Sequence, residues 1–131
     1  MAQNQNHGKM GLIVLKSCSQ LGTEVDQFIR QLRNDDDGES YIIPIEEVRF
    51  SNGEGKVKIH DSVRGRDIYI LCDIGNYSCT YNLFGYENRM SPDDHFQDLK
   101  RVIGAIFGKA RRISVIMPML YEGRQHKRSG R

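Results

Sequence analysis

Residues 91–118 of the chain read SPDDHFQDLKRVIGAIFGKARRISVIMP, and this stretch decides the fold class. Ser91 is a good helix cap, Pro92 suits the first helical position, and the two aspartates that follow favour the positive end of a helix dipole. The next apolar residues recur at spacings of three and four and predict one helix face: Phe96, Leu99, Val102, Ile103, Ile106 and Phe107. Gly108 ends the predicted helix, and residues 113–118 (ISVIMP) have the composition of a buried strand.

Two earlier stretches resemble that strand. Residues 10–15 (MGLIVL) and 67–72 (DIYILC) are short apolar runs, which are typical of strands covered on both faces. Between them, residues 20–33 predict a helix with Ser17 and Ser19 as candidate caps and with one apolar face: Leu21, Val25, Phe28, Ile29 and Leu32. Strands that alternate with helices indicate an α/β domain with a parallel sheet and right-handed crossovers.

A small antiparallel element interrupts this alternation of strands and helices. Residues 41–43 and 48–50 are short β-type segments, the sequence SNGEG that follows has turn chemistry, and apolar residues alternate with polar ones over 56–60. This pattern predicts a hairpin around residues 48–60. Residues 74–90 have mixed polarity with several glycines and asparagines, so we expect an irregular connection there, and an insertion is one interpretation of it.

The composition fits a single domain. The chain has 131 residues, of which 38% are hydrophobic and 27% charged, and no apolar run reaches the roughly 20 residues of a membrane helix. We therefore expect one soluble domain over residues 10–131, with residues 1–9 as a flexible polar leader that has no signal-peptide core. Three cysteines without a Cys-x-x-Cys pair favour a reduced, cytoplasmic setting, and four scattered histidines predict no metal site.

Several common functional motifs are absent from the printed sequence. Residues 53–56 (GEGK) look like a phosphate loop, but neither GxxxxGK[ST] nor GxGxxG is present, and no serine or cysteine stands in a nucleophile elbow. The net charge of +2 is too small to indicate nucleic-acid binding, so we expect neither a nucleic-acid nor a membrane partner. The nucleic-acid alternative depends on basic residues that have no stacking aromatics interleaved with them: Arg111, Arg112, Arg124, Lys127, Arg128 and Arg131.

Three stretches together resemble ribose-phosphate pyrophosphokinases, in the order in which that family has them. Residues 50–54 (FSNGE) resemble the family's Phe-Ser-Asp-Gly-Glu, where asparagine also occurs in the middle position. Residues 61–67 (DSVRGRD) contain Val-Arg-Gly-x-Asp, and residues 118–126 (PMLYEGRQH) resemble Pro-Tyr-x-x-Tyr-x-Arg-Gln-Asp. The resemblance covers nearly all of residues 10–131. It implies the N-terminal domain of such an enzyme, with a phosphoribosyltransferase-like, Rossmann-like fold and a small antiparallel hairpin.

The resemblance also implies an ATP site. In the family, the aromatic residue of the first motif stacks on adenine and the polar residues after it bind the nucleotide of a neighbouring subunit. These roles fall on Phe50, Asn52 and Glu54. The Arg-Gln pair of the third motif binds ATP, with the arginine near the phosphates, and falls on Arg124 and Gln125. The alternatives are a core aromatic with a plain turn for the first motif and a solvated basic loop for the third.

Three positions depart from the family pattern. Met119 and Glu122 stand where the family usually has tyrosines, and His126 stands where it usually has aspartate. These departures motivate an alternative function, a noncatalytic regulatory or assembly subunit of the same ancestry. Arg64 and Arg66 of the second motif are expected to orient the turn before the strand.

The activity that the resemblance implies is transfer of the pyrophosphoryl group of ATP to ribose 5-phosphate, which gives phosphoribosyl pyrophosphate for nucleotide biosynthesis. ATP and ribose 5-phosphate are the expected partners and Mg²⁺ is the expected cofactor. Residues 1–131 contain no ribose-phosphate loop, no metal-binding histidine in its family context and no flexible catalytic loop. We therefore expect an N-terminal half that forms homo-oligomers, holds no catalytic residue of its own and is inactive alone.

Overall fold

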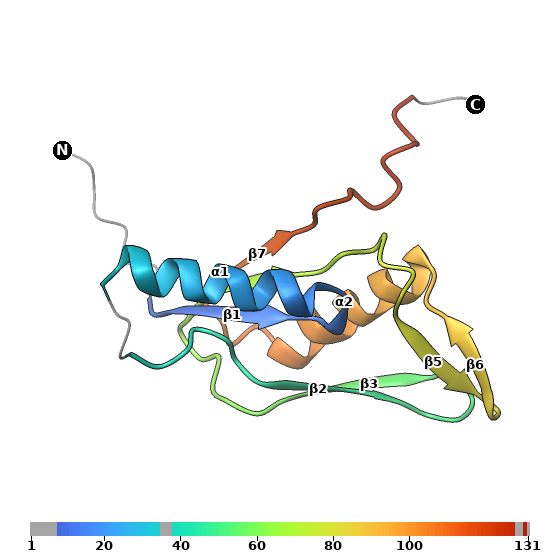
Figure 1. The fold of residues 1–131 in the computed structure, drawn as a ribbon, viewed down its shortest axis with the longest axis horizontal. Coiled ribbons are helices and arrows are strands. Elements are labelled where there is room, and N and C mark those ends of the chain that lie inside the picture. The colour runs from blue at the N-terminus through green and yellow to red at the C-terminus, as the bar shows by residue number, and fades with distance from the viewer. Residues whose placement is uncertain (1–7, 35–37, 128–129, 131) are drawn as a thin grey trace.

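Three parallel strands form the centre of the fold (Figure 1). The computed structural model describes residues 8–34, 38–127 and 130. β1 (Met10–Val14), β4 (Asp67–Leu71) and β7 (Arg112–Ile116) lie in the order β1-β4-β7, and both neighbouring pairs are parallel. The three strands and the parallel sheet predicted from the sequence are therefore confirmed. The burial predicted for them holds for β1 and β4 only. In β7 Ile113 packs against the core, whereas Val115 (41%) and Ile116 (44%) are exposed, so the prediction of a third buried strand is wrong.

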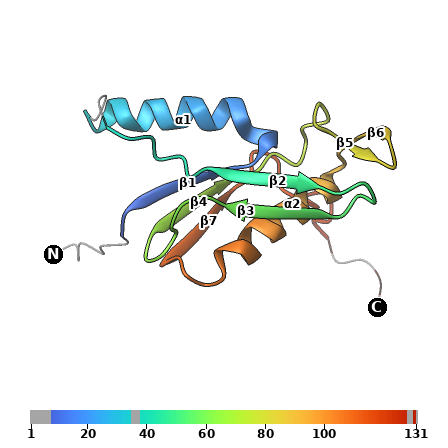
Figure 2. The same ribbon diagram turned by 90° about the horizontal axis from the view of Figure 1, so that it is seen from below.

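One helix covers each face of this sheet, as Figure 2 shows. α1 (Ser19–Leu32) follows β1 after a short 3-10 turn, η1 (Lys16–Cys18), and α2 (Pro92–Ile106) precedes β7. Side chains alternate between the two faces of a strand. Alternate residues of β4 therefore enter the larger core cluster beside α2 or the smaller cluster beside α1. This α/β arrangement, with small antiparallel sheets added, agrees with a phosphoribosyltransferase-like fold.

The start of α2 follows the sequence prediction closely. The Ser91 hydroxyl accepts a hydrogen bond from the backbone N–H of Asp94 (3.2 Å), and the Asp94 carboxylate accepts one from the backbone N–H of Ser91 (2.8 Å). This reciprocal capping box satisfies two N–H groups at the helix start. It also fixes the place of Asp93, the other first-turn carboxylate. At the far end Phe107 (φ 52°) is the C-cap and Gly108 (φ 65°) also lies in the left-handed region.

The apolar face predicted for α1 is only partly correct. Val25 and Ile29 pack against the smaller core cluster, whereas three other predicted members are exposed: Leu21 (38%), Phe28 (60%) and Leu32 (68%). The helix face on β1 contains Gly22 and Asp26 instead, and both are buried. A Cβ atom at Gly22 would lie 2.4 Å from Cγ1 of Val14, so glycine permits the close approach of α1 to β1.

The caps predicted for α1 are wrong. Cys18 is the N-cap, and no side chain caps the helix. Ser17 is buried, and its hydroxyl accepts a hydrogen bond from the backbone N–H of Asp73 (3.1 Å). The Ser19 hydroxyl donates to the carbonyl of Lys16 (3.0 Å). The 3-10 turn thus leads into α1 without a capping side chain. Ser17 connects the carboxyl end of β1 to that of β4.

β2 (Ile45–Arg49) and β3 (Gly55–Ile59) form the predicted antiparallel hairpin, which packs on α2. The segment predicted at 48–50 belongs to β2, which begins earlier, and the strand predicted at 41–43 makes only one parallel bridge, from Ile42 to Leu12. Pro44 separates these two pairings because it has no N–H to donate.

The connection at 74–90, for which the sequence predicts irregular structure, contains a second hairpin. β5 (Thr80–Leu83) and β6 (Tyr86–Arg89) pair antiparallel. Between them Phe84 (φ 47°) and Gly85 (φ 85°) both have positive φ, as a type I′ turn requires. The backbone N–H of Phe84 donates to the carbonyl of Ser51 (2.7 Å), so the tips of the two hairpins are joined. The irregular connection is therefore wrong for residues 80–89.

Some predictions concern parts of the chain outside the described residues. Residues 1–7 of the predicted leader lie there, as do Arg128 and Arg131 of the basic cluster. Within the described ranges, no helix has both the length and the apolar character needed to span a membrane.

Candidate functional site

The segment after β7, residues 117–127, carries the third sequence motif. It leaves the carboxyl edge of the parallel sheet, which is the edge where open α/β sheets bind ligands. Two local hydrogen bonds shape it, from the N–H of Gly123 to the carbonyl of Leu120 (3.2 Å) and from the N–H of Gln125 to the carbonyl of Glu122 (2.9 Å). Glu122 lies in the left-handed region (φ 56°). These turns carry the chain to Arg124, whose side chain is exposed.

Tyr121 attaches this segment to α2. Its hydroxyl donates to Oδ1 of Asp93 (2.5 Å), and its ring stacks on that of Phe96, with 4.0 Å between the ring centroids and an interplanar angle of 8°. The backbone N–H of Tyr121 also points to Sδ of Met117 (3.2 Å). The hydrogen bond to Asp93 is the main cause that raises the pKa of Tyr121 to about 12. The hydroxyl therefore stays protonated, and donates, throughout the physiological range.

A cavity of about 700 Å³ lies between this segment and the start of α2. Its walls are residues 119–125, Pro92 and Asp93 from the start of α2, and Ile74 and Tyr77 from the connection after β4. Arg124 and Gln125 thus border a concave surface. Within the described ranges, no residue pairs with the Arg124 guanidinium, so its five N–H donors are available to a ligand.

The first motif forms the tip of the β2–β3 hairpin. The N–H of Phe50 donates to the carbonyl of Glu54 (2.7 Å), and Oδ1 of Asn52 accepts from the N–H of Glu54 (3.1 Å). Gly53 has φ 92°, a conformation that favours glycine. Phe50 is 49% exposed, so its ring is not a core residue, and Asn52 and Glu54 are exposed as well.

Arg49 holds this tip against the rest of the domain. Its Nη1 donates to the carbonyl of Gly53 (2.9 Å), its Nη2 pairs with Oδ2 of Asp98 (3.3 Å), and its guanidinium lies over the ring of Tyr81 (4.5 Å to the centroid). Asp98 is a buried residue of α2, and it also binds Nη1 of Arg101 (2.5 Å). The tip is thus supported by a buried carboxylate and by the second hairpin.

The two motifs share one support but do not meet. In the residues that the structure describes, no hydrogen bond or ion pair joins residues 50–54 to Arg124 or Gln125. Asp93 anchors the segment after β7 and Asp98 anchors the hairpin tip, and the Cα atoms of these two residues are about 7.5 Å apart along the axis of α2. The two motifs are thus held by different turns of the same helix.

The second motif forms the turn before β4. Arg66 donates from Nη1 to the carbonyl of Ser62 (3.2 Å) and from Nη2 to the carbonyl of Met10 (3.1 Å), and its Nη1 lies 3.4 Å from Oδ2 of Asp61. These contacts connect the turn to the start of β1. For Arg66 the predicted structural role is confirmed.

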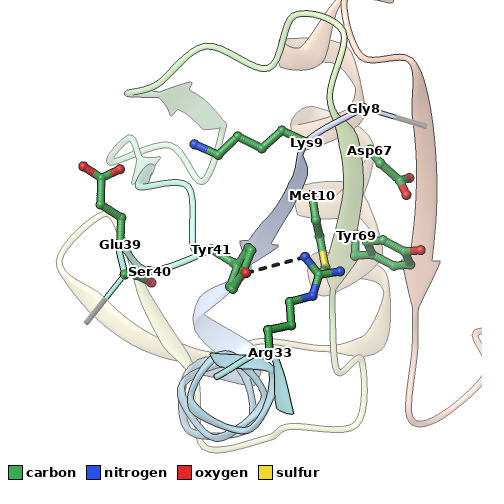
Figure 3. Close-up of a pocket in the computed structure, with 10 residues that line it drawn as sticks. Gly8, Lys9, Met10, Arg33, Glu39, Ser40, Tyr41, Asp67 and Tyr69 are labelled. Atoms are coloured by element: carbon green, nitrogen blue, oxygen red, sulfur yellow. Dashed lines mark hydrogen bonds between the residues drawn. The ribbon is translucent and has the colours of Figure 1, made fainter. Parts of the chain in front are cut away.

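A second, smaller cavity of about 530 Å³ lies at the amino ends of β1 and β4, away from the predicted nucleotide residues (Figure 3). The Arg33 guanidinium lies over the ring of Tyr41 (5.4 Å), and Asp67 binds Arg112 through two hydrogen bonds (2.8 and 2.7 Å). Arg33 and Asp67 are thus already in contact with neighbours. This cavity contains none of the residues of the first or third motif, and we assign it no role.

The described residues contain no group of three His, Cys, Asp or Glu side chains that could hold a metal ion. The three cysteines are free thiols. Burial raises the pKa of Cys18 to about 11, with a further contribution from Asp73, and burial raises the pKa of Cys72 to about 12. Neither group has the lowered pKa of a reactive thiol.

Sequence reasoning missed two supporting contacts, Tyr121 with Asp93 and Arg49 with Asp98. Each joins residues far apart in the chain, 28 and 49 positions respectively. In the sequence Asp93 and Asp98 are two carboxylates of one predicted helix, and no spacing pattern identifies their partners.

The comparisons with known proteins give one result. A comparison with curated proteins finds no match. A family model described as the N-terminal domain of ribose phosphate pyrophosphokinase matches residues 10–131, which is nearly the whole chain. The matched region contains the parallel sheet, both helices, both hairpins and all three motifs. The chain therefore belongs to the family of N-terminal domains of ribose phosphate pyrophosphokinases.

Proposed function

We propose that this domain supplies part of the ATP site of an enzyme that transfers the pyrophosphoryl group of ATP to ribose 5-phosphate. Membership of the family supports the reaction class. The observation that carries the site is the position of Arg124 and Gln125 at the border of a cavity of about 700 Å³ beyond the carboxyl end of β7. In this proposal the Arg124 guanidinium binds phosphate oxygens, for which its planar fork is well suited.

The hairpin tip is proposed to act on a second copy. Phe50 is half exposed and can stack on a purine, while Asn52 and Glu54 present polar groups beside it. Because α2 holds the two motifs at separate anchor points, the proposal has the tip of one copy meet the Arg124 segment of another. This supports a homo-oligomer.

Pyrophosphoryl transfer depends on positioning and on cations that neutralise charge on the phosphate oxygens. Arg124 supplies one such cation in the proposal. Mg²⁺ belongs to the implied chemistry, but the described residues provide no metal-ligand cluster, so we assign Mg²⁺ no ligand here and derive no step through it.

The experiment compares Arg124→Ala with Arg111→Ala in the full-length protein. Arg111 is also an exposed arginine, and it lies in the turn before β7, outside the cavity. Losing a charge-assisted contact to phosphate typically costs about 1.5 to 3 kcal/mol, or roughly one to two decades in kcat/KM for ATP. Arg111→Ala should change kcat/KM by less than about twofold. Equal kcat/KM for the Arg124 variant and the parent would refute the assignment, provided that thermal melts show both proteins folded.

The alternative function, a noncatalytic regulatory or assembly subunit, has two observations in its favour. Glu122 borders the same cavity as Arg124 and adds a negative charge where the proposal puts phosphates. His126 Nδ1 lies 3.0 Å from the carbonyl of Arg124, in the position where the family usually has a carboxylate. Under this alternative the protein binds ATP weakly and does not turn it over. A turnover assay together with equilibrium binding of ATP therefore separates the two functions.

A further inference from the structure

Residues 118–127, which carry Arg124 and Gln125, have one side-chain hydrogen bond to the rest of the domain and one looser contact, the packing of the Met119 side chain beside Gly75. Residues 118–120 and 122–127 are exposed, and Tyr121 alone is partly buried. In the described part of the chain, the hydrogen bonds that start in residues 118–127 and leave this segment both come from Tyr121, to Sδ of Met117 and to Oδ1 of Asp93. Only the bond to Asp93 reaches another secondary-structure element.

This attachment has two components that restrain different motions. Stacking on Phe96, with centroids 4.0 Å apart and rings 8° from parallel, fixes the plane of the Tyr121 ring. The hydrogen bond to Asp93 (2.5 Å) fixes the position of the hydroxyl along that plane. Both partners stand on the first turns of α2, whose start is itself fixed by the Ser91–Asp94 capping box.

Arg124 follows Tyr121 by three residues, so its Cα lies within about 11 Å of the anchor. The turn between them is tight, because the N–H of Gln125 donates to the carbonyl of Glu122 and Gly123 bonds back to Leu120. A displacement of Tyr121 therefore moves the Arg124 guanidinium with it. Without the anchor, the segment would sample many arrangements in which that guanidinium does not border the cavity.

We propose that Tyr121 is a positioning residue, which holds Arg124 and Gln125 in their binding arrangement through its hydrogen bond to Asp93. The inference rests on the proposed function, since it concerns the same ATP site. A protein whose binding-competent arrangement is only partly populated binds its ligand more weakly by that fraction. The Tyr121–Asp93 contact thus acts on ATP affinity without touching ATP.

The first arm of the experiment measures kcat and KM for ATP in the full-length protein, for Tyr121→Phe and for the control Tyr86→Phe. Phenylalanine keeps the stack on Phe96 and loses only the hydroxyl. We expect KM for ATP to rise about tenfold with kcat within about twofold, because ATP reorders the segment once it is bound. Tyr86 is 76% exposed on β6, and its variant should match the parent.

The second arm tests Asp93, which accepts the hydrogen bond from Tyr121. In Asp93→Asn the amide oxygen still accepts a hydrogen bond from the tyrosine, so KM should rise only about two- to threefold. Asp93→Ala should raise KM about as much as Tyr121→Phe. Combining Asp93→Ala with Tyr121→Phe should add less than about twofold to either single change, because both remove one interaction. Fully additive effects would overturn the assignment.

The third arm measures how readily trypsin cleaves residues 118–127 in the absence of ATP. Trypsin cleaves after Arg124, and cleavage after exposed Lys109 serves as an internal reference in the same digest. Tyr121→Phe should speed cleavage after Arg124 about fivefold relative to Lys109, because local opening controls access to the bond. Unchanged cleavage would overturn the anchor, and faster cleavage with unchanged KM would overturn its role in positioning. If Arg124→Ala leaves ATP kinetics unchanged, the proposed function fails and the positioning role fails with it, whereas the cleavage result still decides whether Tyr121 orders the segment.

Discussion

Replacement of Gly22 by alanine should destabilise the domain, although alanine is the better helix former. The new Cβ would lie 2.4 and 2.6 Å from the two γ carbons of Val14 and 3.0 Å from its Cβ. A rotamer change cannot remove all three contacts, because Cβ does not move when χ1 rotates and valine is stiff at χ1. Overpacking of this kind costs typically about 1 to 3 kcal/mol, against a helix-propensity gain of about 1 kcal/mol. We expect a net loss of up to about 2 kcal/mol in the free energy of unfolding, measured by urea titration.

Gly104 provides a matched control for this prediction. It also lies in a helix, α2, but a Cβ there has no heavy atom within 4 Å. Gly104→Ala should therefore gain about 0.5 to 1 kcal/mol. A Val14→Ala background removes both γ carbons and leaves only the 3.0 Å contact with Cβ, so Gly22→Ala should cost much less there than in the parent. A Gly22→Ala chain as stable as the parent, or one that is equally destabilised in both backgrounds, would show that α1 does not rest on β1 in this way.

Three further predictions concern the chain as a whole. Residues 1–131 alone should form no phosphoribosyl pyrophosphate from ATP and ribose 5-phosphate, because the ribose-phosphate loop is missing from them; turnover above background by the purified polypeptide would contradict this. Sedimentation at high concentration should show self-association that the hairpin-tip variant Phe50→Ala weakens, and a parent that stays monomeric throughout would count against an ATP site shared between copies. Burial raises the pKa of the Cys72 thiol from its ordinary value of 9.0 to about 12, so its contribution to stability is fully present below pH 9 and is lost as the pH rises toward 12. Urea titrations at pH 8 and 10.5 should show a smaller loss of unfolding free energy in Cys72→Ala than in the parent, and an equal loss would refute the burial of this thiol.

The sequence predicted best the elements whose signals are local. Ser91, Pro92 and Asp94 specify the start of α2 through contacts within that turn, and the apolar runs predict the strands β1, β4 and β7. The same runs do not predict burial, because β7 has the composition of a buried strand and yet exposes Val115 and Ile116. The second hairpin escaped prediction because its turn uses Phe84 at φ 47°, a conformation that an aromatic residue seldom adopts.

The face of α1 was mispredicted for a tertiary reason. Hydrophobicity alone favours Leu21, Phe28 and Leu32, but the helix approaches β1 along Gly22 and turns Asp26 toward the backbone N–H of Tyr41. The ATP-binding residues came from the family resemblance rather than from periodicity, and their roles stay predictions. No local pattern indicates the contacts that support these residues. Tyr121–Asp93 and Arg49–Asp98 each join distant parts of the chain and form only when it folds.

The joining of the two hairpins bears on how the domain engages a neighbour. Ser51 accepts a hydrogen bond from Phe84, Leu83 fills the space beside Gly53, and Arg49 links the tip to Tyr81 and to Asp98 of α2. The residues after β6 lead directly into α2. Each of the two hairpins and α2 is therefore connected to the other two, which makes a closed ring of contacts. Flexing the tip alone would break several bonds of that ring at once. In the proposed site shared between copies, adjustment therefore falls to the placement of whole domains, and a change at a distant contact between copies would move Phe50, Asn52 and Glu54 together as a rigid unit.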